Sequence, residues 1–323
     1  MAANQDRSRE NLAVTRIAVA SNTVLTVGKL FIGVSMSSAA VIAEAIHSGV
    51  DLVAAIIAFW AVRKARIPAD ADHAYGHGKY DALSGAAEGL LIFGAAIFII
   101  VEAVRKIIYR QEVERLGLGA LVMGASAVIN FLVSAQLFRV AKRTGSLAVE
   151  ADGHHLRTDV WTSIGVLVGI VLIWTTRIHI LDPIAAFVVA LLILRTAWSI
   201  TRKSFADLLD RSLPPEEEEQ IAEIIRTNHP HWLEFHQLRT RRAGGQRHVD
   251  LHLVTCKNIT VELAHQLTED LEADISKAFP GSEVVSHVEA CEGTREDCDA
   301  GCPMAEVVSG RGGKKTPKSR GKP

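Results

Sequence analysis

Six long apolar segments occupy the first two-thirds of the chain, and they constrain its fold more than any other feature. Each is close to the ~20 residues that a helix needs to cross a bilayer. An even number of crossings places both chain termini on the same side of the membrane. We therefore predict six transmembrane helices, over Leu12–Val34, Ser37–Val62, Leu83–Val104, Leu116–Phe138, Leu147–Trp174 and Ile180–Ile200.

The remaining third of the chain has the pattern of a small soluble domain. A hydrophobic fraction of 49% and a mean hydropathy of +0.20 are high for a soluble protein but low for one made only of membrane helices. Pro214-Pro215 followed by Glu216 to Glu219 is typical of a helix start. The segments that follow are two strand-like runs around the turn Gly244-Gly245, a helix and a last strand, at Leu233–Arg241, Gln246–Val254, Val261–Phe279 and Glu283–Glu289. The order αββαβ predicts an α+β domain with helices on one face of the sheet.

Charge and composition indicate how the chain sits in the membrane. Basic residues after the second, fourth and sixth apolar segments favour cytoplasmic termini, although four more lie in an opposite loop. We expect no signal peptide before the first segment. The sequence shows no organelle signal, so a bacterial inner membrane is the simplest location. A net charge of -1 gives no reason to expect nucleic acid as a partner. We divide the chain into an N-terminus (1–11), a membrane domain (12–211), a cytoplasmic domain (212–290) and a tail (291–323).

The tail has two features that the membrane and cytoplasmic domains do not explain. Cys291, Cys298 and Cys302 are soft ligands, but their spacing matches no strong metal-binding motif. The basic end of the chain has the composition of a disordered segment, and contact with anionic membrane lipid is the alternative.

Two apolar segments carry the same pair of metal-ligating residues. His47 and Asp51 stand four apart in the second segment, as do His155 and Asp159 in the fifth, so each pair shares one face of its helix. Ionisable residues at membrane depth are costly and usually face a bundle interior or a water-filled path. Two imidazoles and two carboxylates make a four-coordinate set suited to zinc or a similar divalent ion. A buried hydrogen-bonded pair on each helix is the simpler alternative.

Further candidate ligands lie outside the apolar segments. Asp70, His73 and His77 follow the second segment; on a short helix the two histidines would share a face, with Asp70 one turn earlier. In the soluble part, histidines are concentrated on strands that must be neighbours. Solvated surface histidines are the alternative for both groups. On one strand, His248, Asp250 and His252 share a face, and on the last strand Glu289 shares the face of His287. The candidate histidines of the soluble part are His229, His231, His236, His248, His252, His265 and His287.

Taken together, these motifs resemble the cation diffusion facilitator family of divalent-metal/proton antiporters, zinc-type. Along the chain, the motifs are HSGVD, DHAYGHGK, HHLRTD, DRSLP and FPGSEVVSHVE, which is the family's order. The match covers about residues 10–290. The resemblance implies a homodimer of six-helix units, with a metallochaperone-like cytoplasmic domain that regulates transport and dimerises. It implies an integral membrane protein that exports Zn²⁺ and takes up protons.

The resemblance also assigns roles to residues. It places the transport site at His47, Asp51, His155 and Asp159, a loop site at Asp70, His73 and His77, and a cytoplasmic site at His236, His252, His265, His287 and Glu289. Many family members have Asp where Glu289 stands. It matches Lys79 and Asp210 to a charge interlock near the membrane surface. A His at position 47 accompanies zinc preference in the family, while Cd²⁺, Co²⁺ and Fe²⁺ remain alternative cargoes.

Two other functions are compatible with parts of the sequence. A membrane metalloenzyme would need an open zinc position and a nearby base, whereas the two ligand pairs can close the coordination shell. A metal sensor or scaffold without transport would have no need of costly charge inside the membrane. Transport is therefore the function we expect.

Overall fold

A computed structural model describes the chain except residues 1, 36–38, 110–116, 177–180, 230–231 and 293–323. It divides into two compact units, Met1–Arg211 with Ala243–Gly245 and Ser212–Arg242 with Gln246–Pro323. The described residues form eight helices and three strands.

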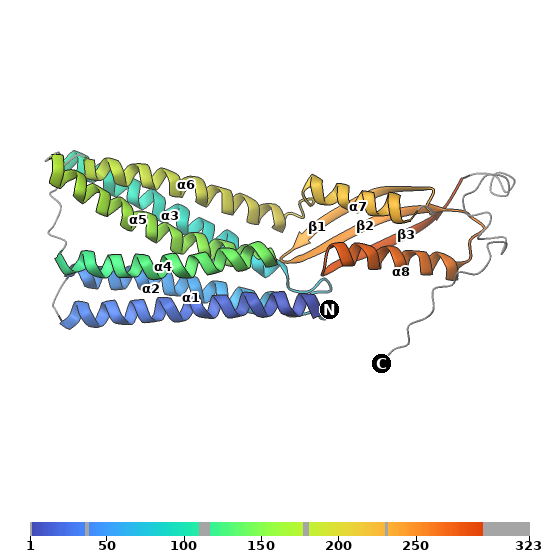
Figure 1. The fold of residues 1–323 in the computed structure, drawn as a ribbon, viewed down its shortest axis with the longest axis horizontal. Helices are drawn as coiled ribbons and strands as arrows, with labels where there is room; N and C mark the ends of the chain where they lie inside the picture. Colours follow the sequence, from blue (N-terminus) through green and yellow to red (C-terminus); the bar gives the residue numbers. More distant parts are fainter. Residues whose placement is uncertain (1, 36–38, 110–116, 177–180, 230–231, 293–323) are drawn as a thin grey trace. The chain divides into compact units, whose positions relative to one another are not determined.

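The first unit is a bundle of six long helices that run side by side (Figure 1). Each predicted segment lies within one helix, apart from short stretches outside the described residues. Over the described residues, five of the helices are long and apolar enough to span a membrane, and α5 is a further helix of 30 residues. The helices are α1 (Ala2–Ser35), α2 (Ala39–Ala65), α3 (Lys79–Tyr109), α4 (Gly117–Thr144), α5 (Leu147–Thr176) and α6 (Leu181–Leu208).

The helices of this bundle pack mainly in pairs, α1 with α2, α3 with α6 and α4 with α5. Small residues allow the backbones of paired helices to come close together. A Cβ added at Gly89 of α3 would clash with Oγ1 of Thr201 on α6, so this glycine is needed where the two helices touch. Large apolar side chains such as Phe31 and Phe98 remain exposed on the outside of the bundle, as expected for surfaces that face lipid.

The second unit is the predicted α+β domain. Its elements are α7 (Pro215–Asn228), β1 (Glu234–Ala243), β2 (Gln246–Thr255), α8 (Val261–Ala278) and β3 (Ser282–Ala290). The sheet has the order β1-β2-β3, and β2 pairs with β3 in parallel, with His252 opposite His287. Gly244, with φ of +61°, occupies the predicted turn between β1 and β2. The fold class expected from the sequence is therefore confirmed.

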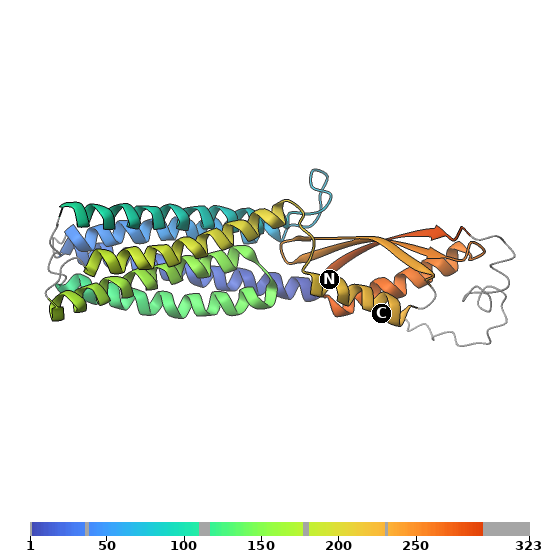
Figure 2. The same cartoon turned by 90° about the horizontal axis from the view of Figure 1, so that it is seen from above.

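Both helices of the second unit lie on the same side of its sheet (Figure 2). Alternate residues of β2, Val249, Leu251 and Leu253, point into the core between sheet and helices. From α8, Leu271 and Ile275 fill the same core and are fully buried. The opposite face of β2 and β3 carries polar side chains, among them His252 and His287 of the candidate cytoplasmic site.

Candidate metal sites

The first candidate site lies between α2 and α5, where each histidine meets the aspartate of the other helix. Nε2 of His155 is 3.2 Å from Oδ1 of Asp51, and Nε2 of His47 is 3.9 Å from Oδ1 of Asp159. Ligand atoms of His47, Asp51 and Asp159 all lie within 4.8 Å of one another. His155 and Asp51 are buried, whereas the His47 side chain is 58% exposed. The four predicted ligands are thus gathered in one place.

The crossed pairing follows from the direction of the two helices. In a bundle of consecutive crossings, α2 and α5 run in opposite directions because an even number of helices separates them. The same H-x-x-x-D spacing on antiparallel helices places the first residue of one motif opposite the last residue of the other. One helical turn, about 5.4 Å, then separates two similar nitrogen-and-oxygen pairs.

Three polar residues around this site were not singled out from the sequence. Asn130 of α4 donates from Nδ2 to Oδ2 of Asp159 at 3.3 Å. Asn22 of α1 donates to the backbone carbonyl of Asp51 at 3.4 Å, and Lys29 of α1 donates to Oγ of Ser48 at 2.8 Å. All three lie within apolar segments. A polar residue at membrane depth is costly, so their position in the sequence was a signal that could have identified them.

The second candidate site is the loop between α2 and α3, and its backbone differs from the expected short helix. Oδ1 of Asp70 accepts the backbone N–H groups of Asp72 and His73, at 3.1 and 2.7 Å. This turn brings the carboxylate within 3.4 Å of Nδ1 of His73 and 3.5 Å of Nε2 of His77. The hydrogen bond from the His73 amide is the main cause that lowers the pKa of Asp70. The prediction of a helical spacing was wrong, but the three side chains do converge.

Two backbone features explain why this loop is not helical. Pro68 lacks an amide donor and restricts the residue before it. Gly76 adopts a φ of +76°, which a right-handed helix does not contain. The ligands are therefore held by a turn that ends at the start of α3.

The third candidate site lies on the open face of the sheet in the second unit. The carboxylate of Glu289 on β3 contacts two of its histidines. Oε1 is 2.7 Å from Nδ1 of His252, and Oε2 is 3.3 Å from Nε2 of His236. Nε2 of His287 is 3.8 Å from the same carboxylate. The hydrogen bond with His252 is the main cause that lowers the pKa of Glu289, with the neighbouring imidazoles adding to it.

The remaining predicted residues lie apart from these three clusters. His265 is on α8, where its Nε2 lies 3.5 Å from Oε1 of Glu269 and its side chain is 69% exposed. Lys79 and Asp210 form an ion pair at 3.0 Å within the chain, and the lysine also donates to the carbonyl of Leu208. Of the tail cysteines, Cys291 is described, while Cys298 and Cys302 lie outside the described residues.

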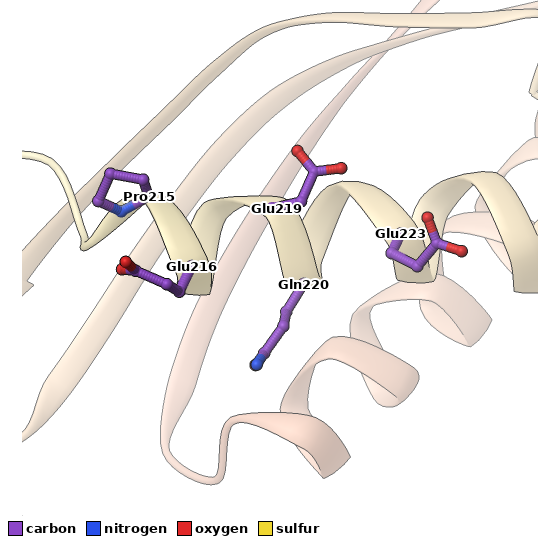
Figure 3. Close-up of a pocket in the computed structure, with 5 residues that line it drawn as sticks. All are labelled: Pro215, Glu216, Glu219, Gln220 and Glu223. Carbon is purple, nitrogen blue, oxygen red and sulfur yellow. The ribbon is translucent and has the colours of Figure 1, made fainter.

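One cavity adjoins α7 and contains no residue of the three ligand clusters. It is an open depression lined by Pro215, Glu216, Glu219, Gln220 and Glu223 (Figure 3). No histidine or cysteine lines it. We do not assign a metal site there.

Family models match both units of the chain. The model described as the cation efflux transmembrane domain matches residues 15–209. The model described as the cation efflux protein, cytoplasmic domain, matches residues 213–291.

Curated relatives extend the match over most of the chain. The transporter sll1263 of Synechocystis sp. is 36% identical over 255 residues, which cover 79% of this chain and 82% of the relative. The cation-efflux pump FieF of Pectobacterium atrosepticum is 34% identical over 275 residues, 85% of this chain and 90% of the relative. A solved structure of CzrB in its Zn form has 43% sequence identity and a TM-score of 0.24, and covers 27% of this chain and 99% of that one.

Proposed function

The chain belongs to the cation efflux family, and from that membership we propose that it exports Zn²⁺ in exchange for protons. The family establishes the broader activity: the protein is an integral membrane transporter of divalent metal cations and not an enzyme. The preference for zinc, the coupling to protons and the site residues are our proposals.

The observation that carries the proposal is the crossed pairing of His47 with Asp159 and of His155 with Asp51. A cation between α2 and α5 would meet two imidazole nitrogens and two carboxylate oxygens, a tetrahedral set that zinc accepts readily. Imidazole is a borderline ligand, so the set disfavours hard ions such as Mn²⁺ relative to zinc. Cd²⁺, Co²⁺ and Fe²⁺ are the competing cargoes to be tested.

The same four residues supply a reason for coupling to protons. An imidazole binds metal only when it is neutral, so metal and protons compete for His47 and His155. The reference pKa of histidine, about 6.5, places this competition near physiological pH. In alternating access, the metal would enter from the cytoplasm, and protons from the opposite side would displace it before the return step.

We assign the other two clusters to supporting roles. The loop cluster around Asp70 would bind metal at the mouth of the bundle. The cluster around Glu289 would bind regulatory zinc, and we propose that the second unit dimerises, with His265 completing this site at the dimer contact. We place the protein in a bacterial inner membrane with both termini in the cytoplasm.

The experiment is flux of a panel of divalent ions into proteoliposomes with an imposed pH gradient. We expect Zn²⁺ uptake with counterflow of protons, and loss of both in His47→Ala and in Asp51→Ala. The matched control is His154→Ala, which removes an imidazole from the same helix turn as His155; that ring packs against Phe138. Exchange that survives in both site variants would refute the site, and equal rates for Fe²⁺ or Co²⁺ would refute the zinc preference.

A further inference from the structure

An arginine lies near one end of the membrane crossing formed by α6. Arg195 is five residues, or roughly 7.5 Å at 1.5 Å per residue, before the end of the predicted crossing Ile180–Ile200. No other described residue forms an ion pair or hydrogen bond with it. A guanidinium is always charged, and a charge at membrane depth is costly unless it is paired. Arg195 therefore calls for an anionic partner.

A cavity of about 350 Å³ between α5 and α6 contains this arginine. Its polar lining includes Lys203, Glu150, Thr196 and Ser199. Lys203 already pairs with Glu150, at 2.7 Å between Nζ and Oε1. Their charges cancel, so Arg195 is the uncompensated charge of the cavity, with two hydroxyl groups beside it.

A second, mainly apolar cavity adjoins this one. It has a volume of about 80 Å³ and shares His154, Leu192 and Thr196 with its neighbour. Trp161, Val189 and Ile193 also line it, together with Thr158 and with Arg157, whose guanidinium stacks on Phe131 and Phe138. Leu192 and Trp161 are 59% and 51% exposed on the outside of the bundle. The ligand that fits both cavities has an anionic head and an apolar chain.

We propose that the groove between α5 and α6 binds an acidic phospholipid, with its phosphate at Arg195. Guanidinium binds phosphate through two parallel hydrogen bonds, and the hydroxyl of Ser199 adds a donor, whereas the hydroxyl of Thr196 donates to the carbonyl of Leu192 in its own helix. One acyl chain lies over Leu192 and Trp161. Basic pockets between membrane helices are a recognised means of binding acidic headgroups. A free anion would satisfy Arg195 but would leave the apolar surface uncovered.

The test is native mass spectrometry of the delipidated full-length chain, titrated with phosphatidylglycerol or with phosphatidylcholine of the same acyl chains. We expect tighter binding of phosphatidylglycerol. Arg195→Gln should weaken its binding at least about tenfold, the ratio that loss of a charge-assisted hydrogen bond gives, and should leave phosphatidylcholine unchanged. Arg202→Gln, an exposed arginine two turns further along α6, is the matched control and should bind as the parent does.

Two further measurements cover a variant that does not fold and a groove that binds any anion. Ser199→Phe fills the cavity while it keeps Arg195, so it should also weaken phosphatidylglycerol binding, even if Arg195→Gln fails to fold. Inorganic phosphate should not displace the lipid. Equal binding of phosphatidylglycerol to the parent and to the folded variants would overturn the proposal, and full displacement by phosphate would assign the groove to a free anion instead.

Discussion

Replacement of Asn130 by leucine tests whether the polar residues around the α2–α5 site hold its ligands in place. The amide of Asn130 donates to Asp159 at 3.3 Å, and the side chain is only 6% exposed. Leucine has a similar volume but no donor. Asp159 would keep its place near His47 and lose one hydrogen bond that orients its carboxylate.

The size of the effect follows from that one contact. A hydrogen bond to a charged group contributes about 1.5–3 kcal/mol, and about 1.4 kcal/mol corresponds to a factor of ten in affinity. We expect Zn²⁺ to bind roughly 10- to 100-fold more weakly, the range typical for the loss of a partner that orients a metal ligand. In the metal-free protein, the lost hydrogen bond to Asp159 is offset because leucine also removes Oδ1 of Asn130, which is buried without a hydrogen-bond partner among the described residues. The stability of the metal-free protein should therefore change little.

The assay is competition with a zinc-binding dye, in a background where His73→Ala and His252→Ala disable the other two clusters. Thermal unfolding without metal is measured in parallel. Ser126→Ala is the matched control, since Ser126 lies one turn away on α4, is also 6% exposed and bonds only to its own helix backbone, at Val122. Unchanged zinc affinity in Asn130→Leu, or an equal loss in Ser126→Ala, would refute the reasoning.

Three further predictions concern the loop and the second unit. Asp70→Asn should keep the turn, because an amide oxygen can still accept the two backbone N–H groups, but should weaken zinc binding; hydrogen exchange and dye competition check this, and equal zinc binding would contradict it. Leu271→Ala should destabilise the second unit by about 2–5 kcal/mol, seen as lost exchange protection in α8 and β2, because Leu271 is fully buried. The hydrogen bond from Arg247 lowers the pKa of Glu217, so its stabilisation is present above the unfolded carboxyl pKa, about 4.3, and is lost as the pH falls through the lower folded value. Calorimetry of Glu217→Gln should therefore show a smaller loss of stability between pH 5 and 3 than the parent, and identical profiles would refute this.

Local sequence pattern was enough for the secondary structure and for the candidate ligands. Apolar length predicted the membrane helices, and the change to alternating residues after Pro215 predicted the αββαβ unit. Spacing of four placed His47 with Asp51, and His155 with Asp159, on single helix faces. The same argument failed for Asp70, His73 and His77, because Pro68 and the positive φ of Gly76 exclude a helix there.

What the sequence by itself determined is each element and the face on which its polar residues stand, since both depend on residues within a few positions of one another. The tertiary structure alone decided that His47 meets Asp159 and that His155 meets Asp51. It also brought Asn130 to Asp159 and left Arg195 facing a cavity. These contacts join residues that are far apart in the chain, and they depend on helix direction and on side-chain packing between helices, which no local pattern encodes.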